Sequence, residues 1–166
     1  LLRGGGLAAE ERHQIIQKLA AYTGLSADFI DRADLRIDIF RFTKELLRDQ
    51  RRSVGRLDSR FLGIDRDAAG ENFEHAPSMS AIIGPYTAAF NHYVRAELEF
   101  ASDLPYEVLK ALDETWSFSD YENRYVDVGE TLRQAININP HLKVFIANGY
   151  YDLATPYFAT EYTVNH

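Results

Sequence analysis

A candidate catalytic acid lies near the C-terminal end of the sequence. Asp152 belongs to the run Gly149-Tyr150-Tyr151-Asp152-Leu153-Ala154-Thr155-Pro156, and the apolar run Leu142 to Ala147 precedes it. Thr155 as N-cap and Pro156 at the first position predict a helix after it, through Tyr162. A strand, a tight loop with an acid and a capped helix is how α/β folds present side chains at the carboxyl edge of a sheet. The alternative is that Asp152 only caps the turn that follows it, and the pattern alone favours this alternative.

The apolar run ahead of the acid predicts a buried strand of the parallel type. Leu142 to Ala147 is short and rich in residues that favour strands, and Asn148-Gly149 closes it. A parallel strand needs neighbours for its backbone hydrogen bonds, and the sequence offers it none. In a structure of this chain alone we expect this segment to pair between copies, or else to be poorly ordered as a strand.

The rest of the sequence predicts a mainly α fold. Apolar residues at helical spacing, with capping residues or prolines at the ends, predict helices over 7–22, 26–32, 37–50, 82–101, 105–112 and 128–136. The helix over 82–101 has an apolar face of more than four turns and is expected to be the spine of a helical core. An extended or hairpin-like segment is predicted over 53–63, and a surface loop over 65–77.

Composition excludes several classes of function. The 166 residues are 46% hydrophobic and 13% aromatic, as in a globular protein. The net charge of -7 would repel nucleic acid. Cysteine is absent, which excludes disulfides, thiolate zinc sites and cysteine nucleophiles. No apolar stretch is long enough to cross a membrane. Because the sequence begins at Leu1 rather than at methionine, we expect it to be a piece of a longer protein.

Several separate runs resemble the serine carboxypeptidase family of α/β-hydrolases, especially its bacterial members. They are Ala21-Tyr22-Thr23-Gly24-Leu25, Leu35-Arg36, Gly55-Arg56-Leu57-Asp58-Ser59-Arg60, and the stretch from Asn139-Pro140 through Gly149 to Pro156. The resemblance covers most of the chain. It implies that residues 1–138 are the helical cap region and that residues 139–166 are part of the hydrolase core, with one strand, the acid loop and a helix. It gives Asp152 the role of the triad carboxylate, which orients the catalytic histidine.

The resemblance implies that the parent protein cleaves C-terminal residues from peptides through an acyl-enzyme, without cofactor or metal, and that it is exported to the periplasm or outside the cell. The other two triad members have no counterpart here. No Gly-x-Ser-x-Gly motif occurs, and Ser26 is better explained as a helix N-cap. His141 begins the predicted strand, roughly 20 Å or more from Asp152 at the ordinary rise per residue. His166 lies in the following helix, so the chain alone is expected to be inactive.

Two other readings stay open. The chain could be an autonomous helical protein-interaction module whose aromatic surface binds a partner and whose strand pairs with another chain. It could also belong to a related α/β-hydrolase with different chemistry, because one fold hosts many reactions.

Three further clusters contain residue types that can form binding sites. Asp65, Asp67 and Gly70 match positions of a calcium loop, but alanines stand at two other ligand positions, so no calcium is expected. A basic cluster could receive a carboxylate or phosphate, although a solvated face with acidic partners is the favoured reading. Aromatic residues between 116 and 125 could line a substrate pocket, with core packing favoured. The basic cluster comprises Arg48, Arg51, Arg52 and Arg56, and the aromatic cluster comprises Trp116, Phe118, Tyr121 and Tyr125.

Overall fold

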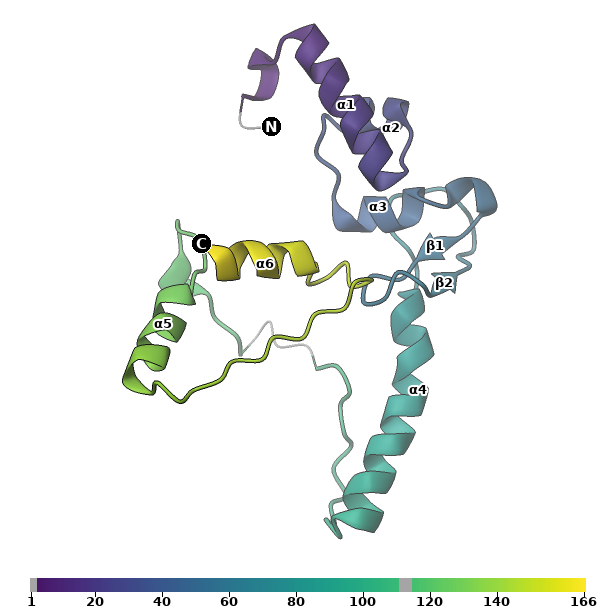
Figure 1. Ribbon diagram of the computed structural model, residues 1–166. Coiled ribbons are helices and arrows are strands. Elements are labelled where there is room, and N and C mark those ends of the chain that lie inside the picture. Colours follow the sequence, from purple (N-terminus) through teal and green to yellow (C-terminus); the bar gives the residue numbers. More distant parts are fainter. Residues whose placement is uncertain (1–2, 111–114) are drawn as a thin grey trace. The chain divides into compact units, whose positions relative to one another are not determined.

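The computed structural model describes residues 3–110 and 115–166 and confirms a mainly helical fold (Figure 1). The chain divides into two compact units, Leu1–Ala81 and Ile82–His166. The division falls within helix α4, Pro77–His92. The cap and core boundary expected at residues 138 and 139 is a division by function, and it stays a prediction.

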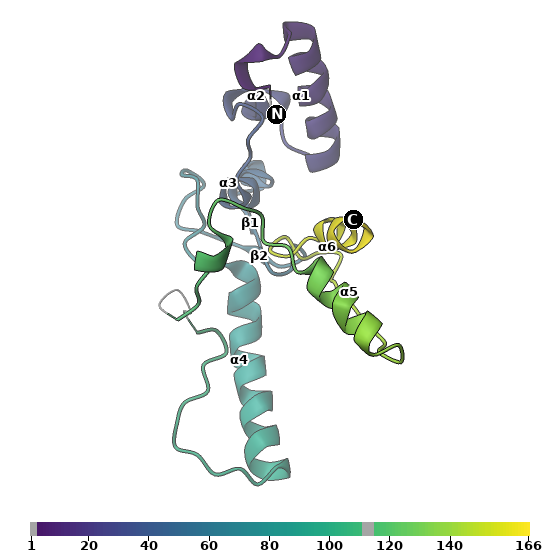
Figure 2. The same ribbon diagram turned by 90° about the vertical axis from the view of Figure 1, so that its left-hand side faces the viewer.

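The first unit begins with a 3-10 turn at Gly4–Gly6, and the two helices that follow lie side by side in both ribbon views (Figures 1 and 2). Helix α1 spans Ala9–Thr23 and α2 spans Ala27–Arg32, close to the predicted ranges. Gly24 ends α1 with φ of 74°, a left-handed conformation that glycine adopts without strain. Ser26 Oγ accepts a hydrogen bond from the Phe29 N–H at 3.1 Å, which confirms it as the N-cap of α2.

The core of this unit lies between α1, α2 and the segment after them. Its buried members are Ile16, Leu25, Ile30 and Leu35. Arg12 on α1 ties the edge of this core to the C-terminal end of α2. Its Nε donates to Asp31 Oδ1 at 2.8 Å, and one of its terminal nitrogens donates to Asp34 Oδ1 at 3.1 Å. The hydrogen bond with Asp31 raises the pKa of Arg12.

Helix α3, Ile39–Glu45, is shorter than the predicted helix over 37–50. It begins one residue after Asp38, whose carboxylate accepts from the Phe40 N–H at 2.8 Å. Leu47 leaves the helical conformation, with φ of -120° and ψ of 27°, and a 3-10 turn follows at Arg48–Gln50. The apolar spacing continues through Leu47, but the backbone turns there to bring the chain into the first strand.

The hairpin-like segment predicted over 53–63 is confirmed. Strand β1, Ser53–Val54, pairs antiparallel with β2, Leu62–Gly63, with Ser53 opposite Gly63. The buried Gly55 follows β1, and a Cβ atom there would lie 2.5 Å from the Asp58 carbonyl oxygen. Asp58 and Arg60 form an ion pair in the connecting loop, and the Arg60 hydrogen bond lowers the pKa of Asp58. Residues 64–76 then form the predicted irregular loop.

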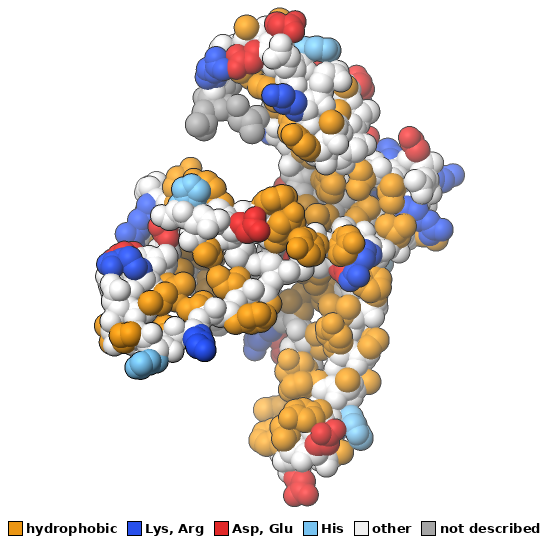
Figure 3. Space-filling model, in the orientation of Figure 1, with side chains coloured by type: hydrophobic (Ala, Val, Ile, Leu, Met, Phe, Trp, Pro, Cys, Tyr) orange, Lys and Arg blue, Asp and Glu red, His pale blue; other side chains and the backbone are white. Residues whose placement is uncertain are grey.

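The second unit contains the rest of α4, a π-helical turn at Tyr93–Glu97, a 3-10 turn at Ser119–Tyr121, α5 at Gly129–Ile138 and α6 at Tyr157–Asn165. The predicted core role of residues 82–101 is wrong in this structure. Ile83, Tyr86 and Tyr93 are exposed, and Figure 3 shows hydrophobic side chains along the visible face of α4. One residue of the apolar face of α4, Phe90, stacks on Tyr106, with ring centroids 3.8 Å apart. No helix forms at residues 105–110, and residues 111 and 112 lie outside the described residues.

The segment expected as a core strand, Leu142–Ala147, carries no strand and runs as an irregular trace between α5 and α6 (Figure 1). Its side chains are exposed, Phe145 to 90%. The expected strand of the hydrolase core is therefore not formed here. The physical reason is the one anticipated for this chain alone, because a parallel strand is not stable without neighbours that share its hydrogen bonds.

Candidate functional site

The loop between Asn148 and Thr155 holds the candidate acid through short local hydrogen bonds. Asp152 Oδ1 accepts from the backbone N–H groups of Ala154 at 2.7 Å and Thr155 at 3.0 Å. The Thr155 hydroxyl donates to Oδ2 at 2.6 Å. The side chain is half-buried. Both carboxylate oxygens are thus engaged, and the carboxylate is held in one orientation.

The same loop is closed from its other end. Asn148 Nδ2 donates to the Thr155 carbonyl oxygen at 3.2 Å, and the Asp152 N–H donates to the Gly149 carbonyl oxygen at 3.3 Å. A Cβ atom on Gly149 would lie 3.8 Å from Asp152 Cβ, an ordinary contact. The loop is therefore a closed turn whose shape depends on Asn148, Asp152 and Thr155.

Thr155 has a different structural role from the predicted one. The sequence predicts it as the N-cap of the last helix with Pro156 inside the helix, but α6 begins at Tyr157 and Pro156 is its N-cap, with ψ of 133°. The Pro156 carbonyl accepts from the N–H groups of Ala159 and Thr160. The Thr155 hydroxyl is turned back to the acid instead. Sequence reasoning missed this contact because a threonine before proline fits an N-cap equally well.

These bonds bear on both readings of Asp152. Two N–H donors from the residues that follow are what a turn-capping aspartate accepts. A carboxylate fixed by N–H and O–H donors is also what orientation of an imidazole requires, since a mobile acid could not hold one tautomer. The geometry suits both readings.

His166 and Ser26, two of the candidate partners, make local contacts. His166 Nδ1 lies 2.8 Å from the Tyr162 carbonyl oxygen, and its ring stacks on Tyr162 with centroids 4.2 Å apart. The His141 side chain is exposed at the start of the irregular segment. Ser26 is the N-cap described above, in the first unit.

The segment around Asp65 and Asp67, which resembles a calcium loop in sequence, is bound by the ammonium group of Lys44. Lys44 Nζ lies 2.6 Å from Asp65 Oδ2, and both side chains are buried, with 5% and 6% of their surface exposed. Lys44 also donates to the Asp67 carbonyl oxygen at 3.0 Å, and Asp65 Oδ1 accepts from the Glu74 N–H at 3.1 Å. Asp65 is thus a structural residue that fastens the loop over 65–74 to α3.

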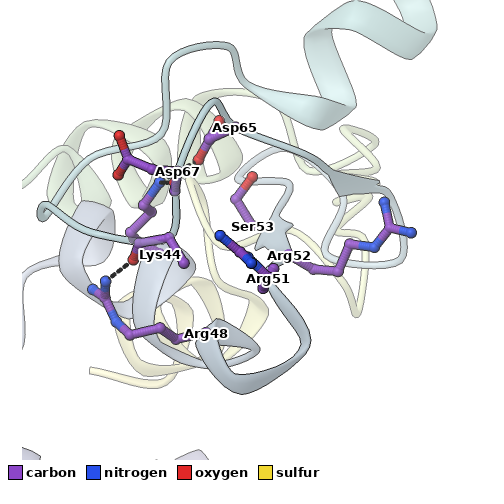
Figure 4. Close-up of a pocket in the computed structure, with 8 residues that line it drawn as sticks. Lys44, Arg48, Arg51, Arg52, Ser53, Asp65 and Asp67 are labelled. Carbon is purple, nitrogen blue, oxygen red and sulfur yellow. Dashed lines mark hydrogen bonds and ion pairs between the residues drawn. The ribbon is translucent and has the colours of Figure 1, made fainter.

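The basic cluster separates into two kinds of arginine. Arg48 pairs with Glu45 and donates to the carbonyl oxygens of Ala68 and Gly70, and Arg56 lies over the Phe40 ring at 5.7 Å. These two fit the favoured reading of a surface with local partners. Arg51 and Arg52 are exposed at the end of the 3-10 turn, beside a small pocket that Figure 4 shows. Their guanidinium groups make no ion pair or hydrogen bond within the described part of the chain.

The aromatic cluster does not fill a core in this structure. Trp116 and Phe118 are exposed, with their rings tilted and their centroids 6.1 Å apart. Tyr125 is 95% exposed, and Arg124 lies over the Tyr121 ring at 4.9 Å. The favoured reading of core packing is therefore wrong for Trp116, Phe118 and Tyr125, which are surface groups here, and Tyr121 is half-buried.

Within residues 3–110 and 115–166, no group of three His, Cys, Asp or Glu residues is arranged to hold a metal ion. No helix in the same part of the chain is both long enough and apolar enough to cross a membrane. Comparison of the chain with protein-family models, with curated proteins and with solved structures finds no match.

Proposed function

We propose that this chain is the cap region and the acid loop of a serine carboxypeptidase-like hydrolase, and that Asp152 is the acid of its catalytic triad. The observation that carries the proposal is the carboxylate of Asp152, held by three donors in a closed turn. The sequence runs that resemble the family place an acid at this position.

The large exposed surface of the chain supports the proposal that other parts of a longer protein cover it. The accessible surface is 13452 Å². Two separate folded domains, each of half this chain's mass, would together expose about 10,000 Å² by the usual scaling of area with mass. The accessible surface of the chain exceeds this value, and the comparison holds for any placement of the two units. The exposed surface includes the apolar face of α4 and the segment Leu142–Ala147. Further chain that covers these residues would remove the cost of exposing them.

In the proposed enzyme the serine attacks the C-terminal peptide bond, and the histidine takes the proton of the serine and returns it to the leaving amino acid. Asp152 accepts a hydrogen bond from the other ring nitrogen, which fixes the tautomer and stabilises the charged ring. No serine or histidine of this chain is assigned to those roles. The chain by itself is therefore inactive, and the peptide substrate binds only the whole enzyme.

The test replaces Asp152 with asparagine in the protein encoded by the whole reading frame. Asparagine keeps Oδ1 as an acceptor for Ala154 and Thr155, and the Thr155 hydroxyl can accept from its amide, so the turn should persist. Turnover of blocked dipeptides should fall by about four orders of magnitude, because the histidine loses its orienting charge. Circular dichroism and melting should be unchanged.

The control is Asp127→Asn. Asp127 Oδ1 accepts from the Gly129 N–H at 2.8 Å, so it is also a turn-capping acid, but it lies outside the acid loop. Its variant should keep full activity. If Asp152→Asn stays as active as Asp127→Asn, Asp152 only caps its turn and the proposal fails.

One observation favours the alternative of an autonomous interaction module. The first unit has a buried core of its own, closed by Arg12 and its carboxylate partners, and needs no further chain to cover it. The second unit, with its exposed aromatic residues, would then be the binding surface. The protein from the whole reading frame separates the two proposals, since a module has no turnover that a serine-directed inhibitor abolishes.

A further inference from the structure

The acid loop contains one hydrogen bond that a turn-capping aspartate does not need. Such an aspartate accepts from the backbone N–H two residues later, as Asp38, Asp67 and Asp127 do here at 2.8 Å each. Within the described part of the chain, these three carboxylates accept no hydrogen bond from a side chain. Asp152 accepts the same kind of N–H bond and, in addition, a bond from the Thr155 hydroxyl at 2.6 Å. The hydroxyl contact is therefore a feature separate from the turn.

The Thr155 hydroxyl and the backbone donors hold different oxygens of the carboxylate. The N–H groups of Ala154 and Thr155 both bind Oδ1 of Asp152, at 2.7 and 3.0 Å, whereas the hydroxyl binds Oδ2. Its length is in the range of about 2.5 to 2.7 Å that is typical of strong bonds from a hydroxyl to a charged carboxylate. Donors on one oxygen locate that oxygen, and a donor on the second oxygen also fixes the plane of the group. The hydroxyl thus contributes to the orientation of the carboxylate.

Thr155 is suited to hold an oxygen in place, because its own conformation is restricted. The residue after it is Pro156, which disfavours the helical region for Thr155 and favours an extended backbone. From the other end of the loop, Asn148 Nδ2 donates to the Thr155 carbonyl oxygen at 3.2 Å. A β-branched side chain also has few rotamers. Little conformational freedom is therefore lost when the hydroxyl points at the acid.

We propose that Thr155 is a positioning residue of the triad, and that its hydroxyl sets the orientation in which the Asp152 carboxylate meets the catalytic histidine. The inference rests on the proposed function, since the role exists only where Asp152 is the triad acid. Thr155 acts through Asp152 and takes no part in making or breaking bonds. Reaction rates fall steeply when a catalytic group is displaced, so a carboxylate that rotates would slow the chemical step and leave peptide binding unchanged.

The test replaces Thr155 with valine in the protein encoded by the whole reading frame. Valine has nearly the same shape and keeps the backbone N–H that binds Oδ1, so the variant loses the hydroxyl contact. The kcat for blocked dipeptides should fall about tenfold to a hundredfold, with KM within about twofold of the wild type. Thr155→Ser keeps a hydroxyl at this position and should restore kcat to within about threefold of the wild type.

The matched control is Thr163→Val. Thr163 Oγ1 donates to the Ala159 carbonyl oxygen at 3.0 Å within α6, so this variant also loses a hydrogen-bonded threonine hydroxyl, but one that binds a helix carbonyl instead of the acid. It should keep the kcat of the wild type. Circular dichroism and melting of Thr155→Val should match those of Thr163→Val, which separates a loss of positioning from a loss of folding.

A double variant tests whether Thr155 acts through Asp152. If it does, removal of the hydroxyl has no further effect once the charged carboxylate is gone. Asp152→Asn combined with Thr155→Val should then turn over at the rate of Asp152→Asn alone. A further loss of about tenfold in the double variant would mean that Thr155 acts on another group, and it would overturn the proposal.

Two other results would also overturn it. One is a kcat of Thr155→Val equal to that of Thr163→Val, and the other is a kcat of Thr155→Ser as low as that of Thr155→Val. Where Asp152→Asn has lost its turnover in the same assay, either result removes the role of Thr155 and leaves Asp152 as the triad acid. Where Asp152→Asn is as active as Asp127→Asn, the proposed function itself fails and the role of Thr155 fails with it.

Discussion

Single residues fix the local geometry of this protein by the hydrogen bonds and the space around them. Gly24 ends α1 and Ser26 begins α2, as the sequence predicts. Glycine adopts the left-handed C-cap conformation without strain, and a serine hydroxyl before a helix accepts from a backbone N–H group of its first turn. Thr155 shows the limit of such reasoning. Its hydroxyl can cap a helix or bond to a nearby carboxylate, and only the fold of the loop around Asp152 decides between them.

Gly55 gives a prediction at this scale. A methyl group there would lie 2.5 Å from the Asp58 carbonyl oxygen and 2.9 Å from Ser78 Cβ, and the carbonyl belongs to a backbone held by the hairpin. Gly55→Ala should therefore lower the free energy of unfolding by about 2 to 3 kcal/mol, as overpacking does. Denaturant unfolding followed by circular dichroism measures this change.

The matched control is Gly84→Ala in α4, where a methyl group meets no atom within 4 Å. It should be neutral or stabilising by up to about 1 kcal/mol, since alanine favours helix over glycine. Equal effects of the two variants would show that the close approach at Gly55 is absent.

At the scale of elements, the chain follows its apolar spacing where a local cap supports it and departs where a tertiary contact decides. Helices α1, α2 and α5 lie near their predicted ranges. Helix α3 ends at Glu45 although the apolar pattern continues, because the chain turns to form β1. No sequence pattern reveals that Lys44, at the end of this helix, meets Asp65 across a loop.

The buried pair of Lys44 and Asp65 predicts a large loss when one partner is removed. Lys44→Met leaves an uncompensated carboxylate with 6% of its surface exposed, and it should cost about 3 kcal/mol or more of unfolding free energy. The double variant Lys44→Met with Asp65→Leu should recover most of this, because no buried charge then remains.

An exposed ion pair on α2 gives the comparison for that experiment. Arg32 and Asp28 lie 2.8 Å apart with both side chains largely in solvent, so Arg32→Met should cost less than about 1 kcal/mol. A similar cost for Lys44→Met, measured by the same denaturant curves, would contradict the account of the Lys44 contact.

At the scale of the whole chain, the sequence predicts the helical class but not the exposure of its apolar residues. The periodicity of 82–101 identifies a helix and one apolar face, and it carries no information on what covers that face. The run Leu142–Ala147 has the composition of a strand, and its formation depends on neighbours that periodicity within the run cannot supply. The turn that holds Asp152 is better predicted, because it is built from local contacts, and the catalytic role of Asp152 stays a prediction.

The exposed run predicts self-association of the chain when it is isolated. Light scattering should give an average mass that rises with concentration, since apolar side chains and unpaired backbone groups in Leu142–Ala147 recruit other copies. Phe145→Lys should reduce this rise, because it places a charge in the run. Tyr125→Lys changes an equally exposed aromatic residue outside the run and should leave it as in the wild type. A wild-type chain that stays monomeric at every concentration would contradict this prediction.

The proposed role of Asp152 requires a serine and a histidine that lie outside these 166 residues. The most direct test is the sequence of the whole reading frame that encodes the chain. We expect a Gly-x-Ser-x-Gly motif on the N-terminal side of Leu1 and a histidine on the C-terminal side of His166, in the order that this hydrolase fold uses. A reading frame that contains neither the motif nor the histidine would contradict it.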